Sequence, residues 1–251
     1  MAAPFRLDHR RAVVTGGASG IGEATVRVLA AAGASVTIVD LDRERAEALA
    51  GELAPAAAAA VFDLTDETAV QAFFRSLPAL DILVNNAGIG FVGSIEETPA
   101  ADWSRLFRVN VDAVYFTSKY ALPLLLASPR GQIVNIGSVA GLTAVKRRAA
   151  YCTTKGAVIA LTRQMAIDYA GRLRVNCICP GTIHSPFVEG YLERFHKDEK
   201  DKVRTELHAR QPIGRMGRPD EVAYMVLYVC SDEAEYATGS ILTIDGGWTA
   251  Q

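Results

Sequence analysis

Two side chains that could exchange a proton with a substrate lie four residues apart, at Tyr151 and Lys155. The segment continues as a helical pattern to Ala170, which predicts that both side chains lie on one face of a helix. An ammonium group there favours the phenolate, so we expect Lys155 to lower the pKa of Tyr151 from about 10 toward the working pH. This spacing alone occurs by chance on many helices. Ser138 adds to it, because it follows an apolar run ending at Ile136 and can meet the tyrosine across a cleft.

A glycine-rich segment at residues 16–22 points to a second kind of chemistry, the binding of phosphate. It follows the apolar run 12–15 and opens a helical pattern over 23–32. Glycines let the backbone approach a pyrophosphate, and a helix N-terminus supplies unpaired N–H groups at a positive dipole end. Asp40 ends the next apolar run, where its carboxylate would accept hydrogen bonds from an adenosine ribose and repel a 2′-phosphate. The pattern predicts NAD rather than NADP, although Arg43 could accommodate that phosphate instead of being a surface charge.

These residues belong to an alternation of apolar runs and helical patterns. The expected strands are residues 12–15, 35–39, 59–62, 82–84, 133–136, 174–178 and 241–244. The expected helices are residues 23–32, 42–53, 66–77, 103–126 and the helix that carries Tyr151 and Lys155. This order predicts the α/β class, with a doubly wound, seven-stranded parallel sheet covered by helices on both faces. No linker divides the chain, so we expect one domain over residues 1–251, with the alanine-rich residues 54–60 as a loop leading into a strand.

One charged segment does not fit a compact sheet. Residues 190–211 combine many charges with a helical spacing of Leu192, Phe195, Val203 and Leu207. Two interpretations remain open, a small helical substrate flap over a cleft at about residues 186–213, and a solvated pair of surface helices.

Composition excludes several classes of protein. The 251 residues carry 26 Lys and Arg against 28 Asp and Glu, and these charges are interspersed, so no basic stripe for nucleic acid is expected. Half the residues are hydrophobic, yet no run approaches the roughly 18 apolar residues of a membrane helix, and the N-terminus lacks a signal-peptide pattern. We expect a cytoplasmic protein. With four cysteines and four histidines, reduced core thiols are expected and no metal site is assigned.

Motifs along the whole chain resemble the short-chain dehydrogenase/reductase family. They are Thr15-Gly16-x-x-x-Gly20-Ile21-Gly22, Asp63-Leu64, Asn85-Asn86-Ala87-Gly88, Asn110 in Val-Asn-Val, Ser138 in Gly-Ser-Val-Ala-Gly, Tyr151-x-x-x-Lys155, Pro180-Gly181 and Asp245-Gly246-Gly247-Trp248. The resemblance implies a Rossmann-type dehydrogenase acting on a CH–OH group, in which Tyr151 is the general acid/base and Ser138 orients the substrate oxygen. It further implies that Lys155 holds the nicotinamide ribose and that Asn110 positions a water that relays the proton.

The same resemblance implies a set of cofactor-binding residues. They are Gly16, Ser19, Gly20, Ile21, Gly22, Asp40, Asp63, Leu64, Asn86, Ala87, Gly88, Tyr151, Lys155, Pro180, Gly181, Ile183 and Ser185. Ser185 stands where the family often has threonine, and it retains the hydroxyl.

Arg148, three residues before Tyr151, is the main indication of a substrate. A guanidinium there could bind a carboxylate bidentately, and the alternative is a solvated surface charge. The resemblance makes Arg210 a second candidate for binding the carboxylate, and the alternative is an ion pair within the flap. With Ser138 and Tyr151 they form the expected substrate site. The resemblance extends to the branch that oxidises small hydroxy acids, which are 2-keto-3-deoxy-L-fuconate, 2-keto-3-deoxy-L-rhamnonate and 3-hydroxybutyrate. Thr143 and His184 could supply partners for sugar hydroxyls, which favours sugar acid catabolism with oxidation at C4.

Three further expectations concern other functions and assembly. A 3-oxoacyl thioester reductase would need NADPH and a basic face, against which Asp40 and the net charge of −2 argue. A nucleotide sensor without catalysis would not need Asn110, Ser138, Tyr151 and Lys155 together. The resemblance implies a homotetramer, in which the apolar helical faces at 103–126 and 156–169 could pair across a two-fold axis.

Overall fold

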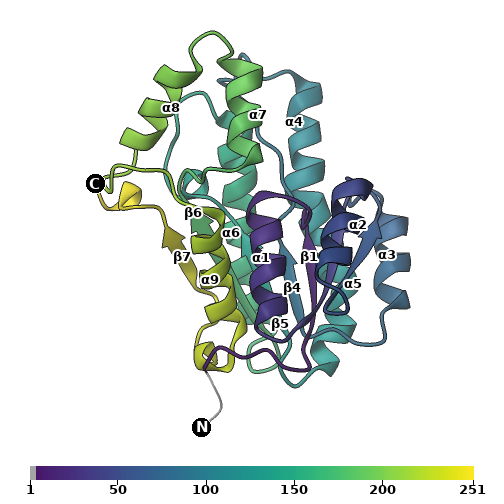
Figure 1. The fold of residues 1–251 in the computed structure, drawn as a ribbon. Coiled ribbons are helices and arrows are strands. Elements are labelled where there is room, and N and C mark those ends of the chain that lie inside the picture. The colour runs from purple at the N-terminus through teal and green to yellow at the C-terminus, as the bar shows by residue number, and fades with distance from the viewer. Residues whose placement is uncertain (1–3) are drawn as a thin grey trace.

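A computed structural model describes residues 4–251 as a sheet between two layers of helices (Figure 1). The strands are β1 Arg11–Thr15, β2 Ser35–Asp40, β3 Ala57–Val61, β4 Ile82–Asn85, β5 Gln132–Ile136, β6 Arg174–Pro180 and β7 Ile241–Ile244. The helices are α1 Gly20–Ala31, α2 Arg43–Glu52, α3 Glu67–Ser76, α4 Ala100–Phe107, α5 Ala113–Ala127, α6 Ala149–Asp168, α7 Pro186–Phe195, α8 Lys200–Ala209 and α9 Pro219–Cys230. A π-helical turn at Arg108–Asp112 joins α4 to α5, so that the single expected helix 103–126 is three consecutive helical segments.

The seven strands lie in the order β3-β2-β1-β4-β5-β6-β7, and every pairing is parallel. The predicted doubly wound α/β fold is therefore confirmed. In the sheet, β2 and β3 lie on one side of β1, and β4 to β7 follow on its other side. A crevice forms outside the carboxyl ends of the strands where this order reverses, which is between β1 and β4.

Both faces of the sheet are buried, as the continuous apolar runs require. Neighbouring residues of β1 pack against helices on opposite faces of the sheet, because side chains alternate along a strand. Val14 packs in the cluster with residues of α1, α2 and α9, whereas Val13 packs with residues of α3, α5 and α6. The sheet thereby forms a rigid base for the loops at its carboxyl edge.

The third strand corrects one expectation. The alanine-rich segment was expected to be a loop, but most of it is β3, which pairs over Ala57–Val61 with β2 over Val36–Asp40. Alanine has low strand propensity, and the pairing with the already formed edge of the sheet decides its conformation.

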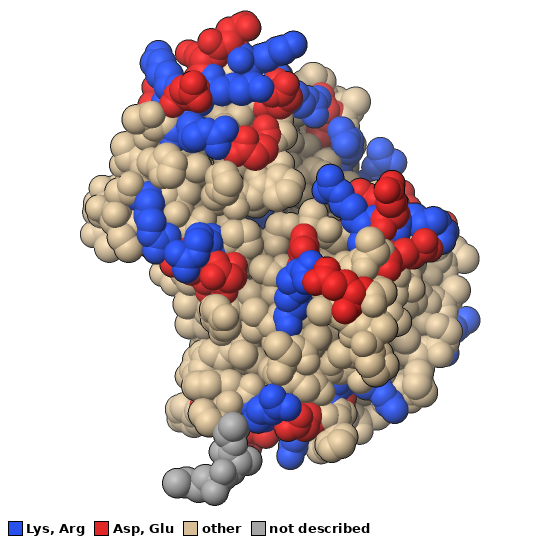
Figure 2. All heavy atoms as spheres, in the orientation of Figure 1, with Lys and Arg blue, Asp and Glu red and all other residues tan. Residues whose placement is uncertain are grey.

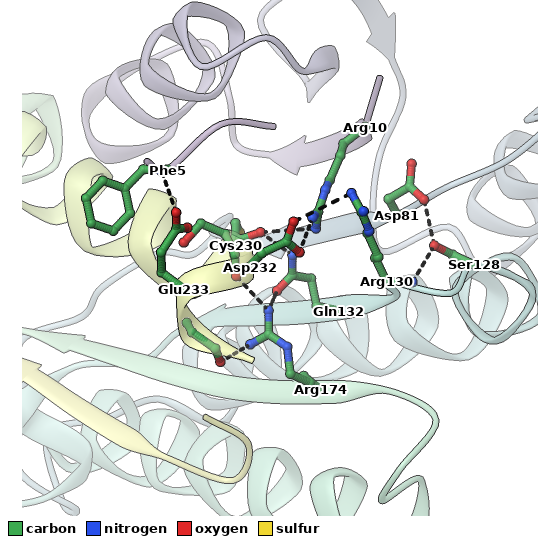
Figure 3. A network of polar contacts seen from close by, with 12 residues as sticks. Phe5, Arg10, Asp81, Ser128, Arg130, Gln132, Arg174, Cys230, Asp232 and Glu233 are labelled. Carbon is green, nitrogen blue, oxygen red and sulfur yellow. Dashed lines mark hydrogen bonds and ion pairs between the residues drawn. The ribbon is translucent and has the colours of Figure 1, made fainter. Parts of the chain in front are cut away.

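A polar network closes the opposite, amino-terminal edge of the sheet (Figure 3). Arg174, at the start of β6, donates hydrogen bonds to the carbonyl oxygens of Val229 at 2.9 Å and of Ala234 and Ala237 at 3.1 Å. Arg10 is buried before β1 and pairs with Asp232 at 2.5 Å. These cations satisfy carbonyl groups where α9 ends, and so tie the last helix to the sheet far from the cavity described below.

All four cysteines are free; Cys177, Cys179 and Cys230 are buried and Cys152 is half-buried, which agrees with the expected reduced thiols. None of the helices within residues 4–251 combines the length and the apolar character that crossing a bilayer requires.

Candidate active site

A cavity of about 570 Å³ lies at the carboxyl edge of the sheet, and residues of α7 and α8 are among those that line it. All of the predicted catalytic and cofactor-binding residues line it except Gly22 and Asn110, as do Arg148 and Arg210. The lining residues that were predicted are Gly16, Ser19, Gly20, Ile21, Asp40, Asp63, Leu64, Asn86, Ala87, Gly88, Ser138, Arg148, Tyr151, Lys155, Pro180, Gly181, Ile183, Ser185 and Arg210. Residues at the ends of β1 to β6, residues of α6 and Arg210 after α8 thus meet in one place, because parallel strands end at a common edge.

The glycine turn fits a pyrophosphate. Helix α1 begins at Gly20, and the preceding Ser19 makes no side-chain capping hydrogen bond, so the first N–H groups are left for an anion. Gly16 has a φ of +59°, and a Cβ there would lie 2.9 Å from the Ala87 Cα. Gly22 is buried beneath this turn, where a Cβ would overlap the Gly16 carbonyl oxygen. Gly22 therefore permits close packing of the turn and does not line the cavity, and its expected cofactor contact stays a prediction.

Asn86 fixes the glycine turn to the end of β4. Its side-chain amide donates to the carbonyl oxygens of Thr15 at 3.0 Å and Gly16 at 2.9 Å. The Thr15 hydroxyl in turn accepts from the N–H groups of Asn86 and Ala87, at 3.0 and 3.2 Å. The central strands β1 and β4 are thereby joined at the switch point, where a dinucleotide would cross them.

Asp40 stands at the end of β2, where an adenosine ribose would lie. Its carboxylate accepts hydrogen bonds from the N–H groups of Ala18 and Asp42, each at 3.0 Å. A carboxylate oxygen has more than one lone pair, so both oxygens can still accept from ribose hydroxyls. Arg43 is exposed and paired with Glu47 at 2.8 Å on the surface of α2, which places its charge in an intrahelical ion pair.

The three residues expected to perform acid/base chemistry converge at the other end of the cavity. Ser138 follows β5, and its hydroxyl faces Tyr151 closely enough to favour the phenolate. Lys155 is buried on α6, where its Nζ donates to the Ile136 carbonyl oxygen at 2.8 Å and lies 6.0 Å from the centre of the Tyr151 ring. Tyrosine and lysine occupy one face of α6, as the spacing predicts.

The direction of the Tyr151 pKa corrects a second expectation. Burial raises the pKa of Tyr151, and this outweighs the opposite effects of Ser138 and Arg148. Burial also lowers the pKa of Lys155, which Cys177 and Cys179 partly offset. The prediction that Lys155 lowers the pKa of Tyr151 was thus wrong for this structure, because the spacing of two residues contains no information about their desolvation.

Asn110 does not line the cavity itself and lies in the turn that joins α4 to α5. It is buried in the π-helical turn, where its Oδ1 accepts from the Ile89 N–H at 2.8 Å and its Nδ2 donates to the Ile89 carbonyl oxygen at 2.9 Å. The Nδ2 also donates to Thr154 at 3.1 Å. Its side chain therefore holds the loop after β4 against α6, and its expected role in positioning a water stays a prediction.

Two guanidinium groups line the cavity, Arg148 close to Tyr151 and Arg210 close to Arg148. Arg148 is half-buried, and burial, followed by the nearby charge of Arg210, lowers its pKa. Neither Arg148 nor Arg210 forms an ion pair with a carboxylate anywhere in residues 4–251. Two neighbouring cations without carboxylate partners make this part of the cavity suited to an anion.

Other residues were misplaced or missed by sequence reasoning. Thr143 is exposed outside the cavity, and His184 is exposed and lies 3.3 Å from Glu189. Phe187 and Tyr191 of α7 line the cavity but were not predicted. Their spacing of four, with Phe195 four further on, was the available signal, because such a spacing aligns three rings on one face of a helix. Within residues 4–251 no three metal-binding side chains gather.

Comparisons with known proteins identify the family. A family model described as "Enoyl-(Acyl carrier protein) reductase" matches residues 16–249. The chain is 41% identical to 2-(S)-hydroxypropyl-CoM dehydrogenase 3 of Xanthobacter autotrophicus, covering 98% of both chains. It is 39% identical to 2-keto-3-deoxy-L-fuconate dehydrogenase of Xanthomonas campestris, covering 97% of this chain and 81% of the relative.

A solved structure agrees. The crystal structure of gox2181 superposes with a TM-score of 0.91 at 33% identity, covering 98% of each chain. The relatives named above are dehydrogenases that act on different substrates. The chain therefore belongs to the short-chain dehydrogenase/reductase family, as an enzyme that acts on the CH–OH group of a small molecule with a nicotinamide cofactor.

Proposed function

We propose that this enzyme is an NAD-dependent dehydrogenase that oxidises a secondary hydroxyl of a small carboxylate, and that the substrate is a 2-keto-3-deoxy sugar acid of the L-fuconate or L-rhamnonate type, oxidised at C4. The observation that carries this proposal is the pair of neighbouring cations Arg148 and Arg210, which line the cavity, with Arg148 close to Tyr151, and have no carboxylate partners in the described chain. A carboxylate held there would bring a hydroxyl a few bonds away toward the phenol.

The remaining site residues support a metal-free oxidation. Tyr151, as its phenolate, takes the hydroxyl proton, while Ser138 donates to the same substrate oxygen and fixes its position. Lys155 and the residues of the glycine turn would hold the cofactor, whose nicotinamide supplies the hydride acceptor when bound. Asn110 acts indirectly, because it fixes Ile89 beside the cavity.

Asp40 supports NAD as the cofactor. A 2′-phosphate would place a second anion against its carboxylate, and Arg43, the cation that could compensate, is paired with Glu47. The 3-oxoacyl thioester reductase is disfavoured on the same ground, because that reaction would need NADPH.

The choice of acid rests on a relative and on the cavity. The similarity to 2-keto-3-deoxy-L-fuconate dehydrogenase supports the sugar acid. The exposed positions of Thr143 and His184 favour a second candidate, because without them fewer hydroxyl partners face the substrate. That candidate is 3-hydroxybutyrate, which has no hydroxyl groups beyond the one that is oxidised.

Initial rates of NADH formation test the proposal. We would assay 3-hydroxybutyrate, the two 2-keto-3-deoxy sugar acids and neutral secondary alcohols of matched size, each with NAD and with NADP. The expected result is turnover of an acid with NAD, and a loss of about 100-fold in kcat/KM for that acid in Arg148→Ala. Turnover of neutral alcohols alone, or equal losses for acid and alcohol in the variant, would contradict anion recognition by Arg148.

A further inference from the structure

Helix α7 faces the site with aromatic rings spaced four residues apart. Phe187 lies with its ring centre 6.2 Å from that of Tyr151. One turn further on, the ring of Tyr191 lies under Arg148, with 4.4 Å between the guanidinium carbon and the ring centre. Helix α7 thus contacts separately the predicted acid/base and the predicted anion ligand.

The hydroxyl of Tyr191 is itself held by a polar chain at the turn between the two flap helices. It lies 2.7 Å from Nε2 of His196, whose Nδ1 lies 3.2 Å from a carboxylate oxygen of Glu199. All three groups are satisfied when Nδ1–H donates to Glu199 and Nε2 accepts from the phenol. His196 follows the last residue of α7 and Glu199 precedes α8, so this chain links both helices to Tyr191.

This arrangement restricts Arg148 from two sides. Its Nη1 donates to the Phe91 carbonyl oxygen at 3.3 Å, while the Tyr191 ring covers one face of the guanidinium. A phenol that donates to histidine has a more electron-rich ring, which strengthens the attraction between that ring and a cation. A half-buried arginine held in this way loses less side-chain freedom when it binds a ligand.

We propose that Tyr191, held by His196 and Glu199, is a specificity-determining residue that positions the Arg148 guanidinium for the anionic group of the substrate. Tyr191 acts through Arg148 and takes no part in the hydride or proton transfer. The inference rests on the proposed function, since it assumes that Arg148 binds an anion. It means that the enzyme prefers anionic substrates only when α7 is docked over the cavity.

The first experiment compares variants of α7 by one ratio, kcat/KM for the acid divided by kcat/KM for the matched neutral alcohol. In Tyr191→Leu we expect this ratio to fall about tenfold, mainly through KM for the acid. Phe195→Leu is the comparison: it removes a ring from the same helix that packs on Tyr191 and Phe91, with centres 6.0 and 6.2 Å apart, but is not stacked on the Arg148 guanidinium, so we expect a smaller fall. An equal fall in the control would show that general docking of α7 is responsible and would overturn the proposal.

The second experiment tests the polar chain without removing a ring. Tyr191→Phe and His196→Ala should each lower the ratio about threefold, and the double variant should lower it no further, because both remove the same hydrogen bond. His196→Gln, which keeps an acceptor, should restore part of the loss. Additive losses in the double variant would exclude the His196 contact as the cause.

Arg148→Ala separates the two hypotheses. If Arg148→Ala leaves the ratio unchanged, the proposed function fails. If it lowers the ratio, and Tyr191→Leu lowers it in the native enzyme but not in Arg148→Ala, Tyr191 acts through Arg148 as proposed. If Arg148→Ala lowers the ratio and Tyr191→Leu does not, only the role of Tyr191 fails.

Discussion

The buried phenol of Tyr151 couples activity to pH. Burial raises its pKa, so the phenolate that accepts a proton from an alcohol forms mainly at alkaline pH. We therefore expect the rate of alcohol oxidation to rise with pH through the alkaline range, and the reverse reduction, which needs the phenol, to be faster at lower pH.

Tyr151→Phe should abolish both reactions while NADH still binds, as followed by NADH fluorescence. Loss of NADH binding in this variant would mean that the residue is structural.

Asp40 gives a second prediction for a single residue. Asp40→Ala removes the charge that would repel a 2′-phosphate and the acceptor for ribose hydroxyls. KM for NAD should rise and KM for NADP should fall, so that the ratio of kcat/KM for NAD to NADP drops at least about tenfold. The comparison variant is Arg43→Ala, which breaks only a surface pair with Glu47. An unchanged preference in Asp40→Ala would show that another group selects the cofactor.

At the level of elements, the start of α9 makes a testable contribution to stability. Glu221 accepts from the Arg218 N–H at 2.7 Å and pairs with Arg215 at 2.7 Å, and these contacts lower its pKa to about 2. A carboxyl whose pKa is depressed on folding stabilises the protein above its unfolded pKa of about 4.5, and this contribution is lost as the pH falls toward about 2.

Glu221→Gln should therefore lower the free energy of unfolding by about 1–2 kcal/mol at neutral pH, through loss of the charged contacts at the helix N-terminus. The difference from the native protein should shrink as the pH falls from about 5 to about 2, because Glu221 of the unfolded chain takes up a proton in this range while the folded protein still holds the carboxyl ionised. Urea unfolding of both proteins at several pH values measures this difference in the free energy of unfolding. A difference that stays constant with pH would rule out the carboxylate charge as its origin.

Strands and helices with their own apolar pattern could be predicted from sequence, and β4, β5 and β6 appear close to their expected bounds. The start of the alanine-rich β3, at Ala57 and Ala58, could not, because only pairing with β2 selects its conformation. The helical nature of residues 190–211 was predictable from Leu192, Val203 and Leu207, which pack together in the structure. The choice between a flap over the cavity and a solvated pair of helices was not predictable, since the orientation of Tyr191 depends on how α7 packs on distant parts of the chain.

At the scale of the whole molecule, the site depends on contacts between distant parts of the chain. Motifs placed Ser138, Tyr151 and Lys155 correctly, because a parallel sheet brings its strand ends together. The partners of Asn110 and the pKa of Tyr151 depend on burial among residues remote in sequence. The surface shows charges of both signs intermixed, without a continuous basic area on the face seen in Figure 2. This agrees with the balanced composition and with the expectation of a small-molecule substrate.

The expected homotetramer can be tested at an exposed apolar residue. Ile167 near the end of α6 is 77% exposed, and Tyr115 on α5 is 47% exposed, both within the helices expected to pair between subunits. Covering an apolar side chain exposed to this degree by a second copy of the chain stabilises the assembly, whereas an aspartate there would have to be desolvated at a cost in free energy. We expect a tetrameric mass for the native chain in light scattering and a smaller assembly for Ile167→Asp. The control is Ile95→Asp, because Ile95 is 71% exposed outside those helices and its substitution should leave the mass unchanged. A native monomer, or an unchanged mass in Ile167→Asp, would contradict pairing through α6.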